Sequence, residues 1–326
     1  MKIGLIDVDG HHFPNLALML ALREAHVKIA AYHKGQGDTV EWVNYWDRYD
    51  RVYCSKVFTY TPDVLTCIQA DEVMRGGTGY NFSDELFCDG VVPDYSLYPM
   101  FPAAYGFLTR GCIRQCDWCI VPYKEGKIRA YCDIQTVLQG RKKAILLDNN
   151  VLACSFGLEQ IEKIVDLKCR VDFNQGLDSR LVTDDVAKLL SKVKWIRYIR
   201  FALDTESQTD ALLSAIEKLN RHGIKNRKIF VYTLLRELDE SYRRINLVKN
   251  LGARPFAQPY IRFDEKNKIP QWQLDMANYT NHTAKLKSID FKDYRPRRGF
   301  KCAEYFTSYF VRSTSKENKE YKEIKE

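Results

Sequence analysis

The 326-residue sequence lacks any run of about 18 apolar residues, the length that a helix needs to cross a bilayer. Its first residues, MKIGLIDVDG, lack the basic segment and long apolar core of a secretion signal. Both absences predict a cytoplasmic protein without a membrane partner. A large excess of one charge is also missing, since 50 Lys and Arg stand among 42 Asp and Glu and leave a net charge of +8. This balance permits an anionic partner such as nucleic acid and equally fits a solvated surface.

A second CxxC cysteine pair is absent as well, although the chain has ten cysteines. Three of them, Cys112, Cys116 and Cys119, lie together in the run FLTRGCIRQCDWCIVPY. A closed structural zinc or cluster site takes four ligands, often from two separated pairs. Three thiolates on one loop therefore predict a metal site with one open position, which is typical of catalysis. The other seven stand alone, as reduced thiols do in a reducing compartment: Cys54, Cys67, Cys88, Cys132, Cys154, Cys169 and Cys302.

The first hundred residues alternate between strand-like and helix-like segments. We expect strands at 2–8, 27–33 and 51–57 and helices at 15–25 and 38–46. This alternation predicts an α/β fold with a small, Rossmann-like parallel sheet, assigned to residues 1–95.

Ligands bind at the carboxyl ends of such strands, which draws attention to the loop after the first strand. His11 or His12 there is a candidate ligand of a metal or of cobalamin, whereas helix caps and a solvated turn are the alternative. The glycine-rich run 75–80 could hold an anion with its backbone amides or could be a simple turn.

After Pro93, Pro99 and Pro102 the alternation resumes on a larger scale, so we place a domain boundary there. Six strand-helix repeats predict a partial TIM-like barrel over residues 104–270, followed by an extension over 271–326 with a charged, frayed tail. The expected strands are 106–110, 143–148, 169–174, 197–204, 228–234 and 254–260. Polar residues end most of these strands, and in barrels of this type the chemistry lies at that mouth.

The run Cys112-x-x-x-Cys116-x-Trp118-Cys119, in a loop after the first barrel strand, resembles the radical S-adenosylmethionine (SAM) superfamily. The likeness covers residues 104–262 and implies a [4Fe-4S] cluster on the three cysteines. The open iron would chelate SAM, and reduction would release a 5′-deoxyadenosyl radical that takes a hydrogen atom from the substrate. The resemblance also implies an electron donor such as flavodoxin or ferredoxin.

Further cofactor contacts follow from the same resemblance. Asp148-Asn149-Asn150 stands where the family has Gly-Gly-Glu beside the methionyl amino group, Arg180 could pair with the methionyl carboxylate, and Asp204 could hold the ribose. The remaining candidate contacts are Trp118 and the strand-end residue Gln175.

The N-terminal part is similar to the cobalamin-binding-type domain of one branch of the superfamily. That branch's Asp-x-His-x-x-Gly motif is not matched, so cobalamin is not favoured. The cysteine loop and the following IVPYKEGKIR also resemble the methylthiotransferases, which carry three further cluster cysteines. Cys54, Cys67 and Cys88 do not match that spacing, and buried thiols are the better interpretation.

The substrate stays open between two classes. A nucleobase or nucleotide is favoured by the net charge and by several arginines, and a peptide is the alternative. The arginines are Arg110, Arg262, Arg295, Arg297 and Arg298. A different class of function is a nucleic-acid-binding protein in which Cys132 or His33 completes a structural zinc site with the three cysteines.

Overall fold

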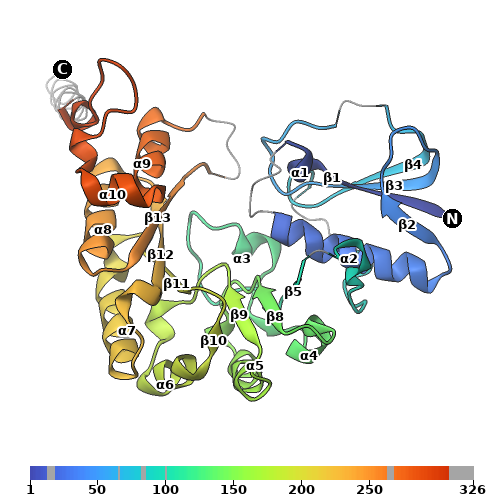
Figure 1. Cartoon of the computed structure of the whole chain (residues 1–326), viewed down its shortest axis with the longest axis horizontal. Helices are drawn as coiled ribbons and strands as arrows, with labels where there is room; N and C mark the ends of the chain where they lie inside the picture. The colour runs from blue at the N-terminus through green and yellow to red at the C-terminus, as the bar shows by residue number, and fades with distance from the viewer. Residues whose placement is uncertain (13–18, 65–66, 82–85, 100, 263–267, 308–326) are drawn as a thin grey trace, which may run out of the picture. The chain divides into compact units, whose positions relative to one another are not determined.

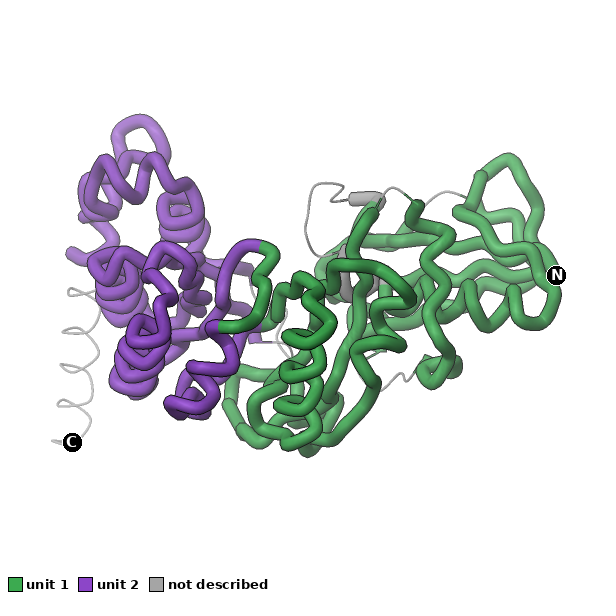
Figure 2. The backbone as a smooth tube through the Cα atoms, turned by 60° about the horizontal axis from the view of Figure 1, so that its bottom comes forward, with its two compact units in different colours: residues 1–175, 192–196 green, residues 176–191, 197–326 purple. Residues whose placement is uncertain are grey.

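The computed structural model of the chain describes residues 1–12, 19–64, 67–81, 86–99, 101–262 and 268–307, without the side chains of residues 11, 12 and 19–23. The chain divides into two compact units (Figure 2). Unit 1 contains residues 1–175 and 192–196, and unit 2 contains residues 176–191 and 197–326.

Unit 1 begins with a four-stranded sheet in the order β2-β1-β3-β4, and all of its strand pairs are parallel. Its strands are β1 (Lys2–Asp7), β2 (Thr39–Trp42), β3 (Tyr49–Ser55) and β4 (Ala70–Gly76). The predicted Rossmann-like sheet is consistent with this arrangement. Ile3 and Leu5 pack with Ile29 and Ala30 on one face, because alternate residues of a strand point to opposite faces. Figure 1 shows helix α2 (Met19–Gly35) beside this sheet.

Two elements of this region differ from the prediction. Residues 27–33, expected as a strand, belong to α2, because His26, Ile29, Ala30 and His33 are all buried at the i, i+3, i+4, i+7 spacing of a helix face. The segment expected as a helix from residue 38 instead holds the edge strand β2, which pairs with β1. Short apolar runs are ambiguous between the two periods, and the tertiary packing decides them.

A second parallel sheet of unit 1 has the order β10-β9-β8-β5. Its strands are β5 (Ala103–Gly106), β8 (Lys143–Leu146), β9 (Arg170–Phe173) and β10 (Lys194–Trp195). Helices α4 (Ile134–Leu138) and α5 (Ser155–Asp166) connect them. Next to β5, the short antiparallel pair β6 (Thr109–Arg110) and β7 (Arg129–Ala130) carries the three cysteines and helix α3 (Val121–Lys124) between its strands.

The segment before β5 is bonded both to α2 and to the second sheet, and the N–H of Asp94 donates to the carbonyl of Val27 in α2 at 3.0 Å. Tyr95, in the 3-10 turn η1 (Tyr95–Leu97), accepts a hydrogen bond from the backbone N–H of Tyr105 at 2.9 Å, and its hydroxyl lies 3.1 Å from the carbonyl oxygen of Val137. Because Tyr95 is buried, these bonds satisfy its hydroxyl inside the core.

Unit 2 holds the parallel sheet β11-β12-β13, made of β11 (Ile199–Ala202), β12 (Ile229–Leu235) and β13 (Arg254–Pro259). Its helices are α6 (Asp184–Lys192), α7 (Thr209–Arg221), α8 (Leu238–Asn250), α9 (Gln271–Asn281) and α10 (Thr283–Ser288). The side chain of Thr183 accepts a hydrogen bond from the N–H of Val186 at the start of α6. The expected tail lies outside the described residues.

The fold class is therefore α/β with parallel sheets, as predicted. The expected strands 143–148 and 169–174 correspond to β8 and β9 in unit 1, and the expected strands 197–204, 228–234 and 254–260 correspond to β11, β12 and β13 in unit 2. The strand expected at 106–110 is wrong in its place, because β5 ends at Gly106 and residues 109–110 form β6, which pairs antiparallel with β7. The closed arrangement of the partial barrel and the domain boundaries stay predictions. None of the described helices is long and apolar enough to cross a membrane.

Candidate functional site

The cysteine loop, residues 111–119, follows β6 and is anchored by its first glycine. Gly111 has φ of +81°, and a Cβ there would run into the carbonyl oxygen of Lys127. The N–H of Cys112 donates to the carbonyl of Gly126 at 3.1 Å, which bonds the start of the loop to the segment just before β7. Glycine is required here by both the backbone angle and the close approach.

The sulfur of Cys112 already accepts hydrogen bonds. The N–H of Arg114 lies 3.3 Å and Nδ2 of Asn150 lies 3.5 Å from its Sγ. Cysteine binds metals through its sulfur, so these two donors contact a potential ligand atom. Asn150 was expected beside the cofactor, and here it reaches the first cysteine.

The donor set fits an iron–sulfur cluster in its chemistry, because three half-exposed thiols share one short loop. Among the residues that the structure describes, no group of three or more His, Cys, Asp or Glu side chains converges as a metal centre requires. The cysteine ligands thus stay a prediction supported by residue type and by their spacing on one loop.

Glu125 connects the start of the cysteine loop to the segment after β8 and was not expected from the sequence. Its Oε2 accepts from the N–H of Gly111 at 2.9 Å and from Nδ2 of Asn149 at 2.8 Å, and it lies 3.3 Å from Nε of Arg110. Its side chain is only 11% exposed, so these contacts are shielded from solvent. In the sequence, Glu125 differs from its surroundings only as the one acidic residue in the otherwise basic run KEGKIR.

Arg110 extends this arrangement toward the N-terminal sheet. Its guanidinium lies 4.0 Å from the ring centroid of Phe107 and 5.5 Å from that of Tyr131. The hydroxyl of Tyr131 in turn bonds Asp89 and Lys28, both at 2.5 Å. The strand pair that carries the cysteines is therefore bonded to α2 within unit 1.

Asp148 is buried and forms hydrogen bonds to the backbone at the start of β6. Its Oδ1 accepts from the N–H of Leu108 at 3.0 Å, and from the N–H and the hydroxyl of Thr109 at 2.6 and 2.8 Å. Burial raises the pKa of Asp148 to about 6. Its expected contact with a methionyl amino group stays a prediction, as do those of half-buried Trp118 and of Gln175, which is exposed in the turn after β9.

Arg180 and Asp204 belong to unit 2. Arg180 pairs with Asp178 through two bonds, Nε to Oδ1 at 2.6 Å and Nη2 to Oδ2 at 3.1 Å. Asp204 accepts from the N–H of Leu234 at 3.0 Å, and burial raises its pKa. Their expected roles toward SAM stay predictions.

The glycine-rich run 75–80 forms a turn rather than an anion cradle. The N–H groups of Tyr80 and Asn81 both donate to the carbonyl of Gly77, and the N–H of Gly79 donates to the carbonyl of Lys56. These N–H groups donate to backbone carbonyls of the chain, so they are not directed at a ligand. The side chains of His11 and His12 lie outside the described part of the structure.

Other candidate residues also have partners. Both ring nitrogens of His33 are engaged, by Asp38 at 2.7 Å and Tyr53 at 2.9 Å, which argues against His33 as a fourth zinc ligand and leaves Cys132. Cys54 and Cys88 are buried thiols, as expected, and burial raises their pKa values to about 11 and about 12. Cys67 is exposed, which corrects the expectation that it is buried.

The basic segment 294–298 is partly structural. Arg297 pairs with Asp275 at 2.7 Å, lies 3.2 Å from the hydroxyl of Tyr305 and stacks on the ring of Phe300 at 3.8 Å. These contacts show that the segment around Arg297 packs against residues of unit 2. Arg297 therefore supports a nucleic-acid partner less than the sequence suggests.

Comparison with known proteins shows a distant similarity. No protein-family model matches the chain, and no solved structure does. The chain is similar to tRNA-2-methylthio-N(6)-dimethylallyladenosine synthase of Dehalococcoides mccartyi, with 24% identity over 174 residues. The similar stretch covers 47% of this chain and 42% of the synthase, so the chain spans less than half of that relative's length.

Proposed function

We propose that this chain is a radical SAM enzyme that modifies a nucleobase or nucleotide. The single observation that carries the proposal is the cysteine loop, with the sulfur of Cys112 already accepting two N–H donors. The distant similarity to the tRNA methylthio-adenosine synthase supports the same chemistry. When bound, a [4Fe-4S] cluster supplies the electron that cleaves SAM, and a flavodoxin or ferredoxin would deliver that electron.

The chain's own residues have separate parts in this proposal. Cys112, Cys116 and Cys119 hold the cluster, and Glu125 fixes the first residue of their loop against Asn149. The amide oxygen of Asn149 is an acceptor suited to the methionyl ammonium. Trp118, Asp148, Gln175, Arg180 and Asp204 remain the proposed cofactor contacts. Cobalamin is not part of the proposal.

Anaerobic reconstitution followed by metal analysis tests the cluster. We expect about four irons and four sulfides per chain in the wild type, and far less in Cys112→Ala, Cys116→Ala or Cys119→Ala. The three variants should keep the wild-type circular dichroism spectrum, because the sheets do not depend on that loop. About one zinc with no sulfide, or unfolding of all three variants, would instead indicate a structural metal loop.

A second candidate reaction is methylthio transfer to an adenosine of tRNA, which the name of the distant relative favours. Incubation of the reconstituted enzyme with unmodified tRNA and SAM, followed by nucleoside mass spectrometry, tests it directly. A methylthio-adenosine product that requires Cys112 would support this reaction. Modification of a peptide but not of any nucleotide would contradict the preferred substrate class.

A further inference from the structure

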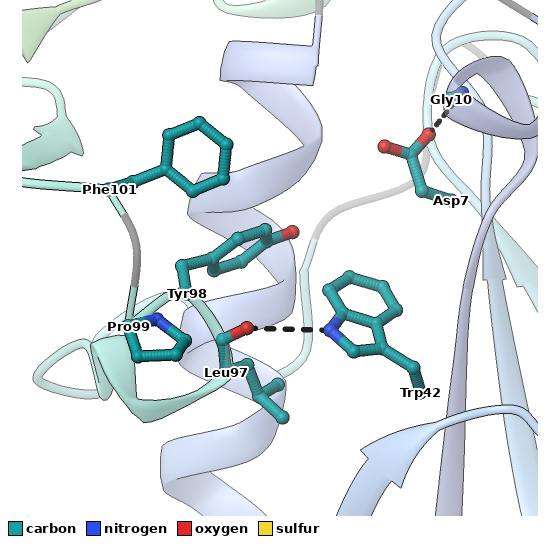
Figure 3. Close-up of a pocket in the computed structure, with 7 residues that line it drawn as sticks. All are labelled: Asp7, Gly10, Trp42, Leu97, Tyr98, Pro99 and Phe101. Carbon is teal, nitrogen blue, oxygen red and sulfur yellow. Dashed lines mark hydrogen bonds between the residues drawn. The ribbon is translucent and has the colours of Figure 1, made fainter. Parts of the chain in front are cut away.

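A cavity of about 340 Å³ lies at the carboxyl ends of β1 and β2 in unit 1 (Figure 3). Two hydrogen bonds of its walls stay within the walls. Oδ1 of Asp7 accepts from the N–H of Gly10 at 2.7 Å, and Nε1 of Trp42 donates to the carbonyl of Leu97 at 3.4 Å. A buried polar side chain that is instead directed at a potential metal ligand lies beside the cysteine loop, and it belongs to Asn150.

The side-chain amide of Asn150 donates to the sulfur of Cys112. Its Nδ2 lies 3.5 Å from Sγ, and the backbone N–H of Arg114 is a second donor to the same sulfur at 3.3 Å. Asn150 is only 2% exposed, so water has little access to this side chain. A hydrogen bond that is shielded from water is electrostatically stronger than one in solvent.

The position of Asn150 in the chain does not by itself explain this contact. Asn150 precedes the 3-10 turn η2 (Val151–Ala153), at a place where asparagine side chains commonly accept a hydrogen bond from the backbone of the following turn. The side chain makes no such capping bond, although its backbone carbonyl accepts from the N–H of Ala153 at 3.0 Å. The amide is therefore directed at the sulfur rather than at η2.

The two residues before Asn150 hold this segment against the same strand pair. Asp148 accepts from the N–H of Thr109 at 2.6 Å, and Nδ2 of Asn149 donates to Oε2 of Glu125 at 2.8 Å. Three consecutive side chains thus contact β6, the segment before β7 and the first cysteine of the loop. Contacts of this kind orient the groups around a metal ligand.

We propose that Asn150 raises the reduction potential of the cluster on the cysteine loop by donating an N–H bond to the sulfur of Cys112. The inference rests on the proposed function, because it concerns the cluster named there. Hydrogen bonds to the ligand sulfurs are among the factors that set the potential of such clusters. The partial positive charge of the N–H favours the reduced state, which carries one more electron. An ionised carboxylate at this position could not act in this way, since it has no N–H to donate.

A redox titration of the reconstituted full-length chain, followed by electron paramagnetic resonance of the reduced cluster, tests the proposal. Asn150→Leu keeps a similar side-chain volume and removes the donor. At a given applied potential, its ratio of reduced to oxidised cluster should be about tenfold smaller, which for a one-electron couple is a potential lower by about 59 mV. Asn150→Gln keeps an amide donor and should recover part of the shift.

The control is Asn220→Leu, the same substitution at an exposed position of α7, and it should keep the wild-type potential. Asn150→Ala covers the case in which leucine does not fit the buried position, and its potential should also be lower than that of the wild type. Because the potential is read from the loaded chains alone, it is independent of how much cluster each variant takes up.

Two results would overturn the proposal. The first is a potential of loaded Asn150→Leu or Asn150→Ala that equals or exceeds that of the wild type. The second is loss of the cluster from both variants while the wild type is loaded, because Asn150 would then hold the loop rather than set the potential.

Iron and sulfide analysis before the titration separates this inference from the proposed function. A wild type that takes up neither would contradict the proposed function and this inference together. A loaded wild type that cleaves SAM and has the same potential as Asn150→Leu would overturn the inference alone.

Discussion

Oxygen Oε2 of Glu125 is within reach of three groups from two segments: the guanidinium of Arg110 and the N–H of the next residue Gly111, and the amide of Asn149. A shielded carboxylate with three donors orients all of them at once, because moving any one breaks a charge-assisted contact. Glu125 touches no cysteine in the described contacts. It is therefore a positioning residue, and its effect should reach the metal through the loop.

Glu125→Ala should lower the affinity for iron, or the rate of SAM cleavage, by about 10- to 100-fold, as loss of a residue that orients metal ligands usually does. Glu125→Gln keeps an oxygen acceptor and should recover part of that loss. Iron content after a gel-filtration step, measured alongside the rate, separates the two effects. The exposed Glu162 of α5 provides the control, Glu162→Ala. Equal iron content in Glu125→Ala and the control would contradict the role of Glu125.

Asp148 gives a pH dependence of stability with a defined sign. Burial raises its folded-state pKa to about 6, above the unfolded value near 4, so the folded chain binds a proton that the unfolded chain has lost. Its contribution to stability is thus fully present below about pH 4 and is lost as the pH rises to about 6, by an amount on the order of 3 kcal/mol. Urea unfolding across this range should show the slope in the wild type and a smaller one in Asp148→Asn.

The matched control for this measurement is Asp210→Asn, since Asp210 is exposed on α7. Its unfolding free energy should follow the wild-type pH profile. A profile of Asp148→Asn that is parallel to the wild type between pH 4 and pH 6 would show that Asp148 is not protonated in the folded state.

At the scale of elements, the strand pair β6–β7 brings the cysteine loop back on itself, and Gly111 is where it turns. Gly111 and Gly126 both have positive φ, +81° and +69°. A Cβ at Gly126 meets nothing within 4 Å, whereas a Cβ at Gly111 meets the backbone of Lys127. The two glycines therefore separate backbone strain from steric clash.

Gly126→Ala should cost about 1 kcal/mol of unfolding free energy through the left-handed backbone alone. Gly111→Ala should cost more and should also lose most of the bound iron, because the clash displaces the first cysteine. Thermal unfolding together with iron analysis of the two variants measures both effects. Full iron content in Gly111→Ala would mean that the cysteine loop tolerates displacement of its first residue.

The sequence predicted most of these elements, and its failures have physical causes. The strands expected at 143–148, 169–174, 197–204, 228–234 and 254–260 are present as β8, β9, β11, β12 and β13. Residues 27–33 were predicted as a strand because they form a short, mostly apolar run. Only the packing of α2 on the sheet shows their helical period. Glu125 could not be predicted as a site residue, since it meets residues 110–111 and Asn149 only after the strands pair.

At the scale of the whole molecule, the candidate cofactor contacts are shared between the two compact units. The cysteine loop, Asp148, Asn149 and Gln175 belong to unit 1, and Arg180 and Asp204 belong to unit 2. The sequence placed each of them at or after a strand end, and the strands of both sheets are parallel as expected.

Formation of 5′-deoxyadenosine from SAM tests the central claim most directly. The reconstituted chain, reduced by dithionite under anaerobic conditions, should yield 5′-deoxyadenosine and methionine in equal amounts, as detected by liquid chromatography and mass spectrometry. Cys112→Ala, treated in the same way, should yield neither above the level of dithionite alone. A wild-type chain that carries its iron and sulfide but leaves SAM intact, or a Cys112→Ala chain that cleaves it equally well, would contradict the account.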